Sequence, residues 1–121
     1  MTARVKIKAQ IMAQDVIALG PGKADLLEQI AGCGSIARAG RELGLSYRRT
    51  RDMVDVLNQC WREPLVSTTR GGTGHGGARL TDTGERVLAA YRTLDAALAE
   101  AARDHAPALL ALLKGDEPAA D

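Results

Sequence analysis

The stretch GGTGHGGARLT, residues 71–81, has the residue types most suited to holding a phosphate. Gly72, Gly74 and Gly77 satisfy the spacing G-x-G-x-x-G of dinucleotide-binding loops. That function requires a loop from strand to helix inside a parallel βαβ unit, with an acidic residue about 20 positions further on. Here the loop leads into ARLT, which is typical of a strand, and the chain has no second βαβ unit. The context favours a glycine-rich turn between two strands, whose glycines can adopt positive φ and let backbone amides approach a phosphate.

A second chemical feature is the concentration of arginine in the middle of the chain. Residues 35–80 contain eight arginines and four acidic residues, a net charge of +4, whereas residues 81–121 have a net charge of −4. The whole chain is almost neutral, at +1. Arginine can bind phosphates and guanines through two hydrogen bonds at once. The uneven distribution therefore predicts a surface that faces nucleic acid.

Cysteine and histidine could also do chemistry, but their spacing is unfavourable. Cys33 and Cys60 lack the C-x-x-C spacing of a zinc site, and His75 and His105 have no obvious companions. No nucleophile, base and orienting group can be assembled, so we expect neither an enzyme nor a bound cofactor or metal. One alternative stays open: a stand-alone metal- or redox-responsive regulator that uses Cys33, Cys60 or the histidines.

These residues must be positioned by a small fold. A chain of 121 residues is long enough for one domain, which we expect over residues 1–115, followed by a disordered tail at 116–121. No apolar run approaches the ~20 residues of a membrane span, and the N-terminus has no signal-peptide core. We expect a cytoplasmic protein without a membrane partner.

The first elements are predicted from apolar periodicity. Residues 4–12 alternate between aliphatic and mainly basic side chains, which predicts a half-buried edge strand. A helix is expected over about 22–32, ended by Gly32 and Gly34.

Residues 35–60 have the pattern of a helix-turn-helix. Ser35 and Ser46 are suited to capping two short helices, and Gly44 lies between them. The small pair Ala39-Gly40 would let the helices cross closely. On the second helix Thr50, Met53, Val54 and Leu57 form the apolar face.

The opposite face of the second helix is polar and rich in arginine. In a helix-turn-helix this recognition helix enters the major groove of DNA. After it, Leu65–Thr69 and Ala78–Thr81 have the composition of two strands, so that residues 65–81 form the wing of a winged helix. Trp61 is expected to anchor the recognition helix against the first wing strand. The residues predicted to contact DNA are Ser35, Ser46, Tyr47, Arg48, Arg49, Arg51, Asp52, Arg70, Thr73, His75 and Arg79.

A long helix is predicted over residues 82–106. Asp82 and Glu85 have the spacing of a capping box, and an apolar stripe runs from Val87 to His105 at steps of three and four. The helix is longer than a small domain needs to cover its core, which predicts that it pairs with a second copy in a homodimer. The predicted fold is mainly α with a small β component: a winged helix-turn-helix with an N-terminal strand and a long C-terminal dimerisation helix.

The string GSIARAGRELGLSYRRTRDMVDVLNQ…PLVSTTRGGTGHGGARLTDTGERVLAAY resembles the N-terminal winged-helix domain of the molybdate-dependent, ModE-type transcriptional regulators. These are similar in their DNA-binding domain to the LysR-type regulators. The resemblance spans about residues 22–104. Its most specific parts are Gly34-Ser35-Ile36, Ser46-Tyr47, Asn58, Leu65-Val66, the glycine wing, and Leu80-Thr81 with Gly84.

The resemblance implies a bacterial homodimer that binds double-stranded DNA at a pseudo-palindromic operator. It further implies a link to molybdenum or other metal metabolism. In the family a separate C-terminal module binds molybdate, and no residue here matches it, so no oxyanion site is expected and the effector is unknown. Arg51 stands where the family usually has Trp, so the family's DNA sequence preference is not carried over.

Overall fold

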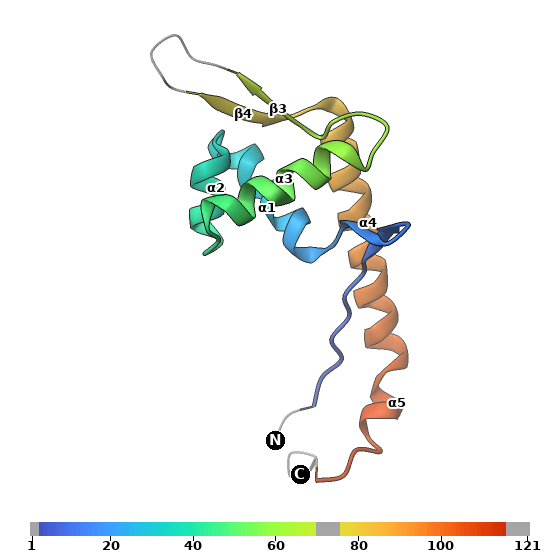
Figure 1. The fold of residues 1–121 in the computed structure, drawn as a ribbon. Coiled ribbons are helices and arrows are strands. Elements are labelled where there is room, and N and C mark those ends of the chain that lie inside the picture. Colours follow the sequence, from blue (N-terminus) through green and yellow to red (C-terminus); the bar gives the residue numbers. More distant parts are fainter. Residues whose placement is uncertain (1–2, 70–75, 116–121) are drawn as a thin grey trace.

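The computed structural model describes residues 3–69 and 76–115, and it has the predicted winged-helix architecture (Figure 1). In chain order the elements are β1 (Ile11–Ala13), β2 (Val16–Leu19), α1 (Pro21–Cys33), α2 (Ile36–Glu42), α3 (Tyr47–Gln59), β3 (Val66–Thr69), β4 (Gly77–Leu80), α4 (Asp82–His105) and α5 (Pro107–Leu110). The described strands form two antiparallel pairs, β1 with β2 and β3 with β4. The fold class predicted from the sequence is thus confirmed.

Helix α1 supplies much of the core. It starts at Pro21, whose fixed φ suits the first helical position, and ends at Gly34 in the left-handed region at φ 72°. Leu26, Leu27 and Ile30 are fully buried beneath the other helices and β4. The helix is slightly longer than expected because Gly32 continues it and only Gly34 ends it.

Helices α2 and α3 form the helix-turn-helix. The hydroxyls of Ser35 and Ser46 accept hydrogen bonds from the amides of Arg38 and Arg49, as expected of N-caps. At the crossing, a Cβ on Gly40 would lie 2.1 Å from Oγ1 of Thr50, which is fully buried. Only glycine fits at this crossing.

The wing is a regular antiparallel pair in which Val66 lies opposite Leu80 and Thr69 opposite Gly77. It is joined to α3 by the side chain of Asn58: Oδ1 accepts from the amides of Leu65 and Val66 at 3.0 and 2.9 Å. Gly76 and Gly77 do not have positive φ, and Gly77 already belongs to β4. The other glycines of the predicted turn, Gly71, Gly72 and Gly74, fall outside the described residues, so the prediction for them stays untested.

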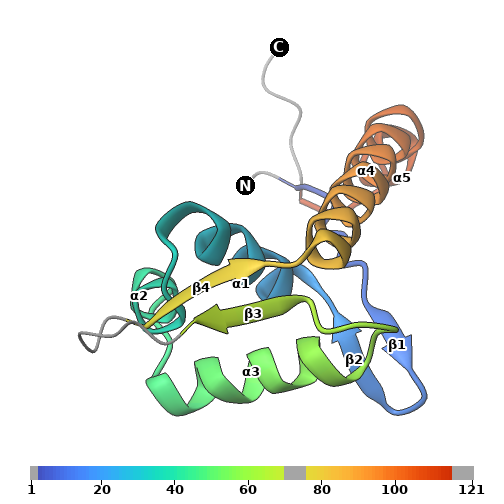
Figure 2. The same cartoon turned by 90° about the horizontal axis from the view of Figure 1, so that it is seen from above.

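Helix α4 begins at Asp82, but the predicted capping box is wrong. The N-cap is Thr81, whose hydroxyl accepts from the amide of Gly84 at 2.9 Å and donates to the carbonyl of Pro64 at 2.7 Å. Gly84 packs so closely on the Leu65 carbonyl that a Cβ would lie 2.2 Å from its oxygen. From this junction α4 projects well beyond the winged-helix core (Figures 1 and 2).

The N-terminal strand predicted over residues 4–12 exists only at its end. Residues 3–10 have no regular secondary structure and run beside the distal half of α4 (Figure 1). β1 pairs instead with β2, a strand that the sequence did not predict, through a tight turn in which Gln14 has φ 56°. Alternation alone cannot supply a pairing partner, and Val5 and Ile7 remain 38% and 42% exposed.

Candidate nucleic-acid interface

The outer face of α3 is the candidate interface. Thr50, Val54 and Leu57 face the core, and Arg48 and Asp52 lie on the opposite, exposed side of the helix. Because successive residues turn by about 100° around an α-helix, Arg49 and Arg51 lie on the two flanks. Arg49 is exposed and Arg51 is half-buried. The helix therefore presents three arginines, together with Asp52 and Asp55, away from the core, on the side that a groove-binding helix turns toward DNA.

Tyr47 occupies the first position of α3 and is 62% exposed. Ser46, just before it, uses its hydroxyl oxygen to cap the helix, and its carbonyl accepts from Oγ1 of Thr50 at 2.7 Å. Ser35 plays the same capping part for α2. Both serines thus fix the start of a helix in the free protein, and their contact with DNA stays a prediction.

The arginines of α3 have no carboxylate partner among the residues that the structure describes. Every ion pair in residues 3–69 and 76–115 involves Arg92 of α4, which contacts Asp25 at 3.0 Å and Glu28 at 2.6 Å on α1. Arginines that are not neutralised within the protein leave their charge available to a phosphate.

Lys23 adds to this positive region, although it is not among the residues predicted to contact DNA. It lies in the first turn of α1, where a Cβ on neighbouring Gly22 would be 3.9 Å from Cε of Met53 on α3. Partial burial and the nearby Arg49 guanidinium lower the pKa of the Lys23 ammonium below its ordinary value. Lys23 therefore adds a positive charge in the neighbourhood of Arg49. The only sequence signal was Lys23 at the start of a Pro-initiated helix.

Further basic side chains flank α3. Arg38 and Arg41 are exposed on α2, the helix that crosses the DNA backbone in a helix-turn-helix, and Arg79 is exposed on β4. The ends of β3 and β4 next to the wing tip lie at the same end of the molecule as the start of α3 (Figure 2). The predicted contacts Arg70, Thr73 and His75 fall outside the described residues.

Among residues 3–69 and 76–115, the cysteines form no recognisable metal centre with other side chains. Cys33 and Cys60 are half-buried free thiols, and Sγ of Cys33 donates to the carbonyl of Ser35 at 3.4 Å. Within the part of the chain that the structure describes, no three His, Cys, Asp or Glu side chains could hold a metal together. No helix in residues 3–69 and 76–115 is long and apolar enough to cross a bilayer.

Sequence comparison finds relatives among molybdenum-related proteins and regulators. The chain is 42% identical over 83 residues to the molybdenum-pterin-binding protein MopA of Rhodobacter capsulatus, covering 69% of this chain and 31% of that protein. It is 41% identical over 96 residues to the molybdenum transport protein ModE of Azotobacter vinelandii, covering 78% and 36%. The DNA-binding transcriptional dual regulator ModE of Escherichia coli K12 is 33% identical over 91 residues, covering 75% and 35%.

The chain spans about a third of the length of these relatives. No family model matches it. Among solved structures, a mutant of ZitR from Lactococcus lactis superposes with a TM-score of 0.56 and 16% identity, over 84% of this chain and 68% of that one. This likeness supports the winged-helix fold independently of sequence.

Proposed function

Because this chain is homologous to the ModE transcriptional regulators over about three quarters of its length, we propose that it is a sequence-specific DNA-binding transcriptional regulator. The single observation that carries the proposal is the outer face of α3. Arg48, Arg49 and Arg51 lie there on a recognition helix whose start is fixed by Ser46, and none of them forms an ion pair with a carboxylate among the described residues. Arg48 and Arg49 contact base edges or the adjoining phosphates in this proposal, and the wing lies along the backbone.

The regulator acts as a homodimer on a pseudo-palindromic site. Helix α4 extends beyond the core and carries a stripe of apolar and small side chains at Leu94, Leu98 and Ala101, of which Leu94 is 40% exposed. A two-fold pair of such helices would bury this stripe. It would also present two α3 helices to successive major grooves about 34 Å apart.

The genes under control concern molybdenum in this proposal, since the relatives carry molybdenum in their names. The similarity to those proteins covers their N-terminal region, which is the DNA-binding part. We therefore assign no molybdate contact to any residue described above.

The test is a double substitution on α3 compared with a charge-matched control. Arg48→Ala with Arg49→Ala should weaken binding to a duplex selected from a randomised library and flatten its salt dependence, by roughly one unit of slope for each phosphate that the protein no longer neutralises. Arg103→Ala with Lys114→Ala removes the same charge from exposed positions near the far end of the molecule and should leave binding nearly unchanged. Arg51 is left in place because it is half-buried.

Fluorescence anisotropy at several salt concentrations would measure both affinity and slope. Equal losses of affinity in the two double variants would mean that only net charge matters, and unchanged binding in the α3 variant would remove α3 from the interface. Either result contradicts the proposed mechanism.

A further inference from the structure

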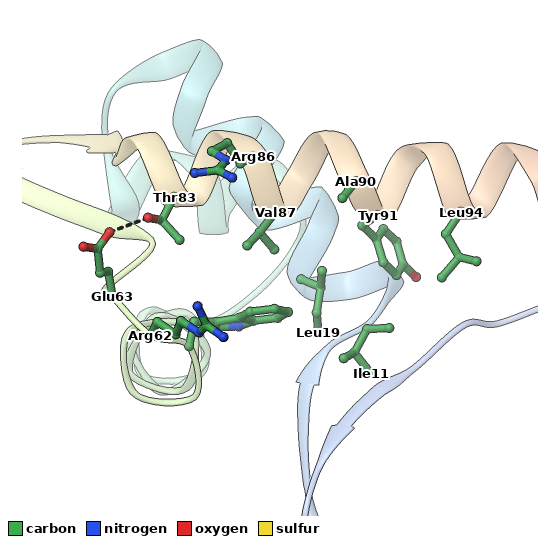
Figure 3. A pocket seen from close by; sticks show the side chains of 11 residues that line it. Ile11, Leu19, Arg62, Glu63, Thr83, Arg86, Val87, Ala90, Tyr91 and Leu94 are labelled. Atoms are coloured by element: carbon green, nitrogen blue, oxygen red, sulfur yellow. Dashed lines mark hydrogen bonds between the residues drawn. The ribbon is translucent and has the colours of Figure 1, made fainter.

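A cavity of about 830 Å³ lies between α4, the β1–β2 hairpin and the segment that follows α3 (Figure 3). Its size is within the range of roughly 300–1,000 Å³ found for small-molecule sites. Leu19 and Val87 form part of an apolar wall, with Leu94 of α4 and Ile11 of β1 at one end (Figure 3). None of these residues takes part in the proposed DNA contact.

The other end of the cavity is cationic. Arg62, from the segment after α3, and Arg86, from α4, come from opposite walls (Figure 3). The one carboxylate in the lining, Glu63, accepts a hydrogen bond from the hydroxyl of Thr83. Neither arginine forms an ion pair with any residue in 3–69 or 76–115. The cavity thus combines a large apolar body with two guanidinium groups that form no ion pair among the described residues.

We infer that this cavity is an effector site for an amphipathic carboxylate, a monoanion with a medium-sized apolar body. The lining carries two positive charges and one negative charge, so one carboxylate balances it. Guanidinium groups bind carboxylates through paired hydrogen bonds, and the apolar body would cover Leu19 and Val87.

A second copy of the chain fits this cavity less well than a small molecule does. In a two-fold contact made here each copy would add its own Arg62 and Arg86 to the same region, and like charges in a closing interface are unfavourable. The hollow is walled by three separate elements and shares only Leu94 with the stripe proposed for dimerisation, whose other members, Leu98 and Ala101, lie further along α4 and do not line the hollow.

The position of the cavity gives it a route to DNA binding. Trp61 lines it directly after α3, and its indole N–H donates to the carbonyl of Ala18 in β2 at 3.4 Å. A ligand would therefore touch the segment that follows the recognition helix and the first half of the helix proposed to dimerise. If its affinity differs between free and DNA-bound protein, DNA affinity changes by the same factor. This last step rests on the proposed function, whereas occupancy of the cavity does not.

The first test uses octanoate and the intrinsic fluorescence of Trp61, the only tryptophan in the chain. In the full chain without DNA, octanoate should shift Trp61 emission with a saturable dependence on concentration, and 1-octanol should bind more weakly. Arg62→Gln with Arg86→Gln should weaken octanoate binding about tenfold or more while leaving 1-octanol unaffected. Arg103→Gln with Lys114→Gln is the charge-matched control and should bind octanoate normally.

Ala90→Phe provides a second variant, because Ala90 is exposed on α4 and lines the cavity, and the change leaves Trp61 as the only tryptophan. The added phenyl ring should fill much of the space and abolish the octanoate effect without unfolding the protein, as followed by circular dichroism. Equal binding of octanoate and 1-octanol, or an unchanged response in the Arg62 and Arg86 variant, would overturn the proposal. Trp61 emission could instead change as the chain self-associates at higher protein concentration, with octanoate no longer binding. That result would assign the cavity to a second copy of the chain and would also overturn the proposal.

Repeating the octanoate titration with the selected duplex separates the two proposals. A change in octanoate affinity on DNA would support the effector role, and an unchanged affinity would reject it. Octanoate binding by a protein that binds no DNA would reject the proposed function while supporting the site.

Discussion

The Asn58 side chain makes three hydrogen bonds to the chain that enters the wing, two as an acceptor and one from Nδ2 to the Val66 carbonyl at 3.1 Å. One amide therefore replaces the backbone partners that the turn between α3 and β3 lacks. The sequence identified Asn58 only through the family resemblance. An asparagine near a helix end has many uses, and nothing in local spacing indicates contacts seven and eight residues ahead.

Tyr91 is the second side chain that joins distant segments, and it makes stability depend on pH. Its hydroxyl donates to the carbonyl of Ala9 at 2.8 Å, and burial, assisted by the nearby Asp95, raises the pKa of the phenol above its ordinary value. In the unfolded chain the phenol ionises near its ordinary value of about 10. The unfolded state therefore loses its proton first, and the contribution of Tyr91 to stability should decline as the pH rises through about 10.

Tyr91→Phe should lower the free energy of unfolding by about 1 kcal/mol at neutral pH and reduce the loss of stability above pH 10. Urea unfolding at several pH values would measure both effects. Tyr47→Phe is the matched control, because Tyr47 is the only other tyrosine and is exposed. If the two variants had the same pH profile, the burial of Tyr91 would not be the cause.

At the scale of elements, the helix-turn-helix was the most predictable part. Capping serines, Gly44 and the apolar face of α3 are local signals, and they identified α2 and α3 correctly. The β1–β2 hairpin was missed because its turn, Gln14-Asp15, has no glycine and its pairing depends on a strand that the sequence does not signal. The start of α4 was placed correctly, but its cap was not, since Thr81 also bonds to distant Pro64.

The close packing of α2 against α3 can be tested by replacing two helical glycines with alanine, Gly40 at the crossing and Gly32 on α1 away from it. Gly40→Ala should destabilise the protein by about 2 kcal/mol or more, because the new Cβ would overlap the buried Thr50 side chain, which is held by its bond to Ser46. Gly32→Ala, where no atom lies within 4 Å of the new Cβ, should stabilise α1 by about 0.5–1 kcal/mol. Chemical denaturation would measure both.

Adding Thr50→Ala to the Gly40→Ala variant should recover part of the lost stability, since it removes Oγ1 and Cγ2 of Thr50, two of the atoms that the new Cβ would overlap, and leaves only the Thr50 Cβ at 2.9 Å. A loss in Gly40→Ala that Thr50→Ala does not reduce would mean that backbone entropy and packing elsewhere, and not the close crossing, determine the effect.

At the scale of the whole molecule, the order of local sequence patterns predicted the winged-helix fold. It did not predict the surface features that form between elements. Lys23 of α1 lies near enough to Arg49 of α3 for the guanidinium to lower its pKa, and the cavity is lined by three elements from separate parts of the chain. Periodicity describes one element at a time, so it cannot show which side chains meet between elements. The outward projection of α4 is also a property of packing, and it leaves Leu94 exposed at the edge of the core.

That projecting helix carries the prediction for assembly. Leu98→Glu places a charge in the middle of the apolar stripe of α4 and should convert a dimer into monomers, because an unpaired charge in a helix interface is costly to bury. Ala96→Glu adds the same charge at an exposed position on the opposite side of α4 and should leave the dimer intact. Sedimentation equilibrium would measure the change. The monomeric variant should bind the full operator about as weakly as it binds a single half-site, a loss of affinity of roughly 10²-fold or more. If the unsubstituted protein is already monomeric, the role assigned to α4 is contradicted.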